Sequence, residues 1–99
     1  MPKSQSSKSN SNGNERKFVI KNKLGLHARP AALFVQTANK FNCDIEVRKG
    51  RQKVNGKSIM GIMMLAAGVG TPIVVKADGS DAENALNALA ELIESNFGE

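Results

Sequence analysis

The spacing of apolar residues between positions 16 and 97 is the feature that most restricts the fold of this chain. Four segments show the alternating or β-branched pattern of strands: residues 16–21, 43–48, 52–55 and 71–77. Three segments show a helical period of 3.6: residues 27–40, 58–67 and 80–97. The pattern therefore predicts the element order β-α-β-β-α-β-α.

Local signals mark the ends of these predicted elements. Pro30 falls in the first turn of the first helix, where its missing N–H costs nothing. Ser58 is placed to cap the second helix, and Ser80 with Glu83 has the spacing of a capping box for the third. Glycines mark a hairpin turn and the end of the second helix: Gly50, Gly68 and Gly70.

The predicted elements indicate an α+β sandwich with helices on one face of the sheet and the other face toward solvent. A right-handed crossover makes the first two strands parallel, and we expect the fourth strand to lie between them. Helical spacing predicts buried positions in the first and last helices: Ala31, Phe34, Val35, Ala38, Ala82, Ala85, Leu86, Leu89, Ile93 and Phe97.

The length of 99 residues fits one small domain. Residues 1–14 contain five Ser, three Asn and no aliphatic side chain beyond Met1, so we expect a flexible polar tail before a domain at 15–99. The tail lacks the apolar segment of a secretory signal, and no run reaches the ~18 residues of a membrane span, so a cytoplasmic location is expected. The single cysteine, Cys43, has the setting of a small buried side chain.

Charge is divided unevenly along the chain. Residues 15–60 hold eleven basic and three acidic side chains, whereas residues 61–99 hold one basic and six acidic. A basic front half favours an acidic partner, which could be a protein, a phosphate group or a nucleic acid. Trp and Tyr are absent, and the four Phe are mostly placed like core residues. Nucleic-acid binding is therefore the least favoured of these functions.

The only histidine, His27, lies at the start of the first predicted helix, in Gly25-Leu26-His27-Ala28-Arg29-Pro30-Ala31. A helix N-terminus offers unpaired N–H groups and a partial positive charge, which stabilise an anion. A phosphoryl group on the imidazole could be held by the backbone of Ala28 and Arg29 and by the Arg29 guanidinium. The residues alone also permit a simpler role, in which His27 only caps the helix.

Other chemistries lack the residues they need. The chain has no second histidine, no paired cysteine and no cluster of carboxylates, so a zinc site and a hydrolytic triad are both disfavoured. No cofactor is expected. The chemistry that remains is the acceptance and donation of a group by His27. A protein with this chemistry is a relay protein and not an independent enzyme.

The stretch GLHARPAA resembles the active-site signature of HPr, the histidine-containing phosphocarrier family of the bacterial phosphoenolpyruvate-dependent sugar phosphotransferase system. The resemblance continues through KSIMGIMML and DAENALNALAELIE and covers residues 16 to 97. It implies that His27 is phosphorylated on Nδ1 and that Arg29 steadies the phosphoryl group. It also implies an open-faced β-sandwich, with a four-stranded antiparallel sheet in the order 1-4-2-3 under three helices.

The second predicted helix has two apolar arcs, only one of which can face the sheet. One arc holds Ile59, Met60 and Met63, and the other holds Ile62, Leu65 and Ala66. Methionines suit adaptable contact surfaces, so the arc of Ile59, Met60 and Met63 is expected to bind partners together with Lys57, with Met64 as a possible extension of that surface. Basic residues are candidates for the rim: Arg29, Lys57 and Lys53. The resemblance implies that the partners are enzyme I and enzyme IIA proteins, bound by a monomer.

Ser58 has two compatible interpretations. It is a helix cap, and the stretch KSIMG around it is similar to the regulatory serine site of HPr proteins that are substrates of HPr kinase/phosphorylase. A phosphate there would add about −2 charge beside the apolar arc. Two alternatives to the sugar phosphocarrier therefore stay open. One is a regulatory binding module that acts on a kinase or transcriptional regulator, and the other is a carrier of the nitrogen-related branch.

Overall fold

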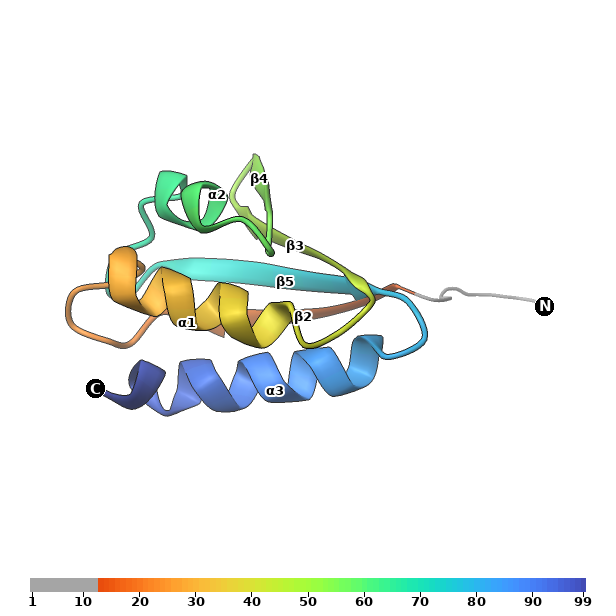
Figure 1. Cartoon of the computed structure of the whole chain (residues 1–99). Coiled ribbons are helices and arrows are strands. Elements are labelled where there is room, and N and C mark those ends of the chain that lie inside the picture. Colours follow the sequence, from red (N-terminus) through yellow and green to blue (C-terminus); the bar gives the residue numbers. More distant parts are fainter. Residues whose placement is uncertain (1–12) are drawn as a thin grey trace.

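The computed structural model describes residues 13–99 as four strands, three helices and a short terminal turn (Figure 1). In chain order the elements are β2(Gly13–Val19), α1(Ala28–Ala38), β3(Asp44–Lys49), β4(Gln52–Asn55), α2(Ile59–Met64), β5(Pro72–Asp78), α3(Ala82–Glu94) and η2(Asn96–Gly98). The predicted order β-α-β-β-α-β-α is confirmed.

The four strands form one antiparallel sheet in the order β2-β5-β3-β4. Both β2 and β3 run antiparallel to β5, so they are parallel to each other with the fourth strand of the chain between them. This is the predicted crossover and the predicted order 1-4-2-3. Pro72 is the first residue of β5, where its missing N–H does not interrupt the hydrogen bonds of the central ladder.

One hydrophobic core holds the helices against the sheet. Helices α1 and α3 lie side by side along the strands (Figure 1), while α2 adds the fully buried side chain Ile62 and its C-cap adds Leu65. Every position that the spacing of the first and last predicted helices placed in the core is buried, including Phe34, Leu86 and Leu89. Because each buried Val, Leu, Ile or Phe side chain stabilises the fold by about 1.5–3 kcal/mol, the two long helices are fixed in place by their inner faces.

Strand β2 begins at Gly13, inside the predicted tail of residues 1–14 and three residues before the predicted start at Arg16. Gly13 and Asn14 pair with Asp78 and Ala77 of β5 through the backbone. The sequence gives no sign of this pairing because neither residue has an apolar side chain. The rest of the predicted tail, residues 1–12, lies outside the described residues.

Helix α2 is shorter than predicted. It ends at Met64 instead of Ala66 or Ala67, and the residue that turns the chain is Ala66 at a φ of 51° instead of Gly68 or Gly70. Beyond this turn, the carbonyl of Ala67 accepts a hydrogen bond from the N–H of Leu26 at 2.9 Å. The segment after α2 is thus joined to the loop before α1.

Helix α3 starts and ends differently from its predicted pattern. The capping box of Ser80 and Glu83 does not form, because Asp81 occupies the N-cap position and α3 shows no side-chain cap. At the other end α3 stops at Glu94, so Phe97 is buried as predicted but lies in η2, outside the helix, at a φ of 57°.

Candidate functional site

His27 lies at the N-cap of α1 with its ring toward solvent. Its side chain is 42% exposed and makes no capping hydrogen bond. The carbonyl of His27 accepts the N–H of Ala31 at 2.9 Å, which begins the helical ladder. The N–H groups of Ala28 and Arg29 precede this ladder and therefore have no partner within the helix. The expected pairing of an accessible imidazole with a helix N-terminus is present.

Arg29 is exposed on the first turn of α1, two residues after His27. Within residues 13–99 its side chain makes no hydrogen bond or ion pair. The guanidinium is therefore free of competing contacts inside the described part of the chain. It can share the charge of an anion bound beside the helix start, as the sequence predicted.

The loop before His27 is held by close contacts. Gly25 has a φ of +74°, and a Cβ at this position would lie 2.5 Å from the carbonyl oxygen of Ala67. Inside the loop, Nδ2 of the buried Asn22 donates to the carbonyl of Gly25 at 2.8 Å. These contacts fix the path of the backbone that delivers the imidazole.

Two residues at this site, Asn22 and Glu99, are not predicted by the sequence pattern. Oε2 of Glu99 lies 3.9 Å from Nε2 of His27 and 3.4 Å from Nδ2 of Asn22. Glu99 belongs to no helical or strand pattern in the sequence that would have predicted its position. Only the turn of the chain at η2 brings it back to the start of α1.

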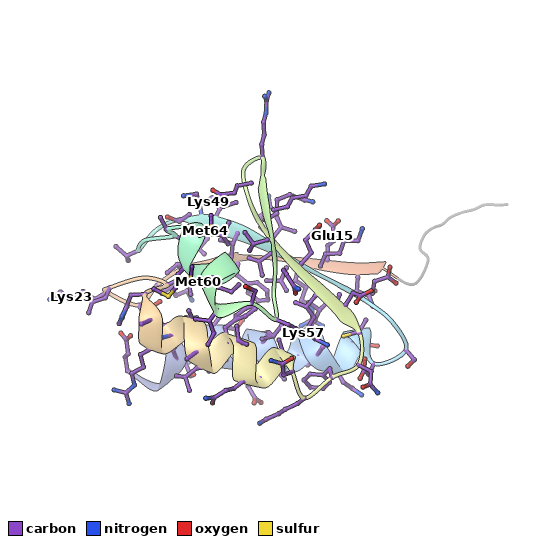
Figure 2. All side chains as sticks on the ribbon, turned by 45° about the horizontal axis from the view of Figure 1, so that its top comes forward. Glu15, Lys23, Lys49, Lys57, Met60 and Met64 are labelled. Atoms are coloured by element: carbon purple, nitrogen blue, oxygen red, sulfur yellow. The ribbon has the colours of Figure 1, made fainter. Side chains whose placement is uncertain are left out.

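The outward arc of α2 is apolar, as predicted. Ile59 and Met63 are 44% and 40% exposed, and Met60 and Met64 are 70% and 66% exposed. We refer to these four residues as the methionine patch. Met60 and Met64 are labelled on α2 in Figure 2. The prediction for Ala66 is wrong, since it is exposed after the helix has ended.

His27 and Met63, one residue of the methionine patch, line the same shallow pocket. Its lining comes from the loop before α1, from α2 and from the segment after α2: Leu24, Leu26, His27, Met63, Ala66, Ala67 and Gly68. Two further apolar side chains of these segments are exposed, Leu24 of the pocket lining at 70% and Val69, which follows Gly68, at 61%. A partner that reaches the imidazole therefore meets an apolar surface beside it.

Ser58 caps α2 as predicted, because its Oγ accepts a hydrogen bond from the N–H of Gly61 at 3.0 Å.

The two lysines predicted for the rim lie apart from the methionine patch or bind other groups. Lys57 Nζ donates a hydrogen bond to the carbonyl of Phe41 at 2.7 Å, beyond the end of α1. Lys53 pairs with Arg48 across β4 and β3. Since Val54 packs against the core, the alternation of the strand turns Lys53 to the opposite face.

Cys43 is buried immediately before β3, in agreement with its predicted role as a small core side chain. Burial raises the pKa of its thiol, and its interaction with Asp81 raises that pKa further.

Among residues 13–99, no group of three or more His, Cys, Asp or Glu side chains is arranged to hold a metal ion. In the same part of the chain, the helices are all too short or too polar to cross a membrane.

Comparison with known proteins identifies the family. A family profile described as "PTS HPr component phosphorylation site" matches residues 14–95. The chain belongs to the HPr family. The resemblance carried by GLHARPAA is thereby confirmed, and with it the family's role as a phosphocarrier of the phosphotransferase system.

Individual HPr proteins are similar over nearly their whole length. The phosphocarrier protein HPr of Neisseria meningitidis is 54% identical over 85 residues, which cover 86% of this chain and 96% of the relative. The crystal structure of HPr from Thermoanaerobacter tengcongensis matches with a TM-score of 0.84 at 58% identity, over 87% of this chain and 97% of that one. The HPr-like protein Crh of Bacillus subtilis is 48% identical over 80 residues, or 81% of this chain and 94% of Crh.

Proposed function

We propose that this chain accepts a phosphoryl group from phosphorylated enzyme I on Nδ1 of His27 and donates it to enzyme IIA proteins. The observation that carries the proposal is the exposed, uncapped imidazole at the first turn of α1. Membership of the HPr family supports the phosphotransferase role and the class of partner. On the same ground we propose that the carrier acts as a monomer in the cytoplasm.

In the proposed transfer, the lone pair of Nδ1 attacks the phosphorus of the donor as the bond between phosphorus and the donor breaks. The group that arrives on His27 carries negative charge on its oxygens. The N–H groups of Ala28 and Arg29, the Arg29 guanidinium and the helix dipole all stabilise that charge. Donation to enzyme IIA is the same step in reverse, so the relay needs no cofactor and ends with His27 unchanged.

Partner binding is assigned to the methionine patch. A relay has to leave one protein to reach the next, which requires small interfaces and fast dissociation. The patch supplies an apolar centre, and Arg29 and Lys23 supply positive charge on the side of the loop and α1 (Figure 2 shows Lys23 projecting from the loop). These features fit acidic partners that dock beside His27. The ammonium of Lys57 donates a hydrogen bond to the carbonyl of Phe41. We therefore propose that Lys57 holds the start of α2 in place and does not contact a partner directly.

We further propose that phosphorylation of Ser58 by HPr kinase/phosphorylase regulates this docking. Ser58 directly precedes Ile59 and Met60 of the methionine patch. A phosphate on Oγ would place about −2 charge at the edge of the patch and repel an acidic partner. The N-terminal end of α2 tolerates that charge, so the fold is expected to survive.

A regulatory module is the second candidate, supported by the 48% identity to the Crh protein of Bacillus subtilis. In that role phosphorylated Ser58 would carry the signal to a transcriptional regulator, and His27 would be dispensable. A carrier of the nitrogen-related branch would use the same His27 chemistry with other acceptors. The exposed His27 and Arg29 favour the carrier over the module.

Incubation with enzyme I and labelled phosphoenolpyruvate tests the proposal. Phosphohistidine is lost in acid whereas phosphoserine survives, so the label on this chain should be acid-labile. His27→Ala should abolish it, and Ser58→Ala should retain it. Label that persists in His27→Ala would refute the assigned site, and loss of label in Ser58→Ala alone would favour the regulatory module.

A further inference from the structure

The face of the sheet turned away from the core carries its charges in rows that cross the strands. The register places four residues side by side in one such row: Lys17 on β2, Val74 on β5, Arg48 on β3 and Lys53 on β4. Their neighbours in the sequence pack in the core: Phe18, Val75, Val47 and Val54. Because successive side chains of a strand point to opposite faces, the four residues of the row face away from the core. We refer to them as the basic row.

The basic row holds more positive charge than the fold itself requires. Arg48 and Lys53 lie directly opposite each other in the pairing of β3 with β4, and like charges in that position destabilise a sheet. Nη2 of Arg48 lies 3.8 Å from Oε1 of Glu15, which is labelled in Figure 2. Within residues 13–99, the ammonium groups of Lys17 and Lys53 form neither an ion pair nor a hydrogen bond. A bound carboxylate would therefore relieve a repulsion already present in the folded chain.

The positive band is only one row wide. The next row holds two carboxylates and one ammonium: Glu15, Lys76, Glu46 and Asn55. Beyond it lie Asp78 and Asp44, paired across β5 and β3. The rows are about 7 Å apart along the strands, and the basic row spans about 14 Å across them. An extended peptide can follow such a band, whereas a nucleic-acid duplex or a bilayer surface would also cover the carboxylates beside it.

The remaining chemistry of the face favours a polypeptide over a single strand of nucleic acid. All aromatic side chains of the chain belong to or pack against the core, so unpaired bases would find no exposed ring to stack on: Phe18, Phe34, Phe41 and Phe97. Val74, half-buried between Lys17 and Arg48, offers an apolar contact instead. We infer that the basic row binds an extended acidic segment of another protein, at a surface separate from His27 and the methionine patch.

Amide NMR of the full-length, ¹⁵N-labelled chain, titrated with a synthetic hexaglutamate peptide, tests this inference. At a salt concentration of about 20 mM, the amide signals of Lys17, Arg48, Lys53 and Val74 should shift with the added peptide. Raising the salt to about 200 mM should weaken the binding about tenfold, because exposed charges are then screened. Amide signals of the basic row that stay in place at peptide concentrations that shift other parts of the chain would overturn the inference, as would an absence of any shift.

Matched variants separate the position of the charge from its amount. Lys53→Glu should weaken hexaglutamate binding about three- to tenfold, since it replaces an attraction by a repulsion. Lys40→Glu makes the same change of charge at an exposed residue just after α1 and should weaken binding less than about twofold. Equal losses in the two variants would overturn the assignment to the basic row.

Stability provides a check on the folded state of Lys53→Glu. The substitution places a carboxylate opposite Arg48, so the urea midpoint should rise. A lower midpoint would show that Lys53 serves the fold and would overturn the argument from unneeded charge.

Two further probes test the kind of partner. A six-nucleotide oligothymidylate and vesicles of phosphatidylcholine with phosphatidylserine should both bind more weakly than hexaglutamate, with no dependence on Lys53. Tighter binding of either probe that is lost in Lys53→Glu would overturn the choice of an acidic protein.

Phosphoryl acceptance tests whether the surface is separate from the relay. Lys17→Gln should accept the label on His27 at the rate of the unaltered chain, because Lys17 lies on the sheet face and not beside the methionine patch. A reduced rate would place the basic row within the relay surface and overturn its separate role. The peptide titration needs no phosphoryl donor, so its outcome does not depend on the proposed function.

Discussion

Gly25 approaches Ala67 so closely that a Cβ on residue 25 would lie 2.5 Å from the Ala67 carbonyl oxygen. The contact joins the loop that carries His27 to the segment that follows α2. The adjacent hydrogen bond from the N–H of Leu26 to the same carbonyl, at 2.9 Å, requires this approach. His27 and the methionine patch are therefore held in one fixed relationship by backbone atoms.

Gly25→Ala should break this relationship. An alanine in this left-handed conformation is strained, and its Cβ would clash with backbone atoms that cannot rotate away. Together the two effects should lower the free energy of unfolding by about 2–4 kcal/mol. Phosphoryl transfer should fall with it. Urea unfolding checks the stability. Gly50→Ala is the control, because Gly50 also has a positive φ but would have no atom within 4 Å of a Cβ. It should cost only about 1–2 kcal/mol, and equal losses in both variants would contradict the clash.

Ser58→Ala should cost about 1 kcal/mol in unfolding free energy, because the N–H of Gly61 loses its hydrogen-bond acceptor. Phosphoryl acceptance by His27 should be retained. Ser58→Asp keeps a capping oxygen and adds a charge, so it should preserve stability and weaken transfer from enzyme I. Ser80→Ala is a control without a cap, and its effect should stay within about 0.5 kcal/mol. A Ser58→Asp chain that transfers at the full rate would argue against regulation at this position.

The sequence was sufficient for those parts of the site that depend on local signals. Pro30 and the helical period place His27 at a helix start, and the two arcs of α2 predict which side is exposed. The contact between Asn22 and Glu99 spans 77 residues, and no periodicity connects them. The same limit explains the failed capping box, since Asp81 is committed to the backbone of Asn42 and Cys43 on another segment. Tertiary partners decided these features, and a single sequence does not display them.

Asp81 should make stability depend on acid pH. Its carboxylate accepts N–H hydrogen bonds from Asn42 and Cys43 at 2.8 and 2.9 Å, and these bonds lower its pKa below the ordinary value of 3.8. The folded chain therefore binds this proton less readily than the unfolded chain. The stabilisation is complete above the unfolded pKa, near pH 4, and is lost as pH falls through the folded pKa.

Urea unfolding at about pH 6 and about pH 3 checks this dependence. Asp81→Asn should be less stable than the unaltered chain at the higher pH, and the difference should narrow at the lower pH. Glu91→Gln removes an exposed carboxylate on α3 and should leave the pH dependence as it was. A stability difference for Asp81→Asn that is equal at both pH values would show that the charge of Asp81 is not the cause.

Met60→Glu should weaken phosphoryl transfer without unfolding the chain. Met60 is 70% exposed, so the substitution removes little buried surface, whereas a new negative charge in the methionine patch opposes an acidic partner. The KM for enzyme I should rise about tenfold or more, with unfolding free energy within about 0.5 kcal/mol of the unaltered chain.

Two matched substitutions show whether the effect belongs to the patch. Val19→Glu places the same charge on another exposed apolar residue, 46% exposed on β2, and should leave the KM unchanged. Ile62→Ala, on the buried arc of the same helix, should instead cost about 2–5 kcal/mol of stability. Because α2 presents one arc to the core and the other to partners, stability and transfer should respond to different faces. Equal loss of transfer in Met60→Glu and Val19→Glu would mean that net charge, and not the methionine patch, governs docking.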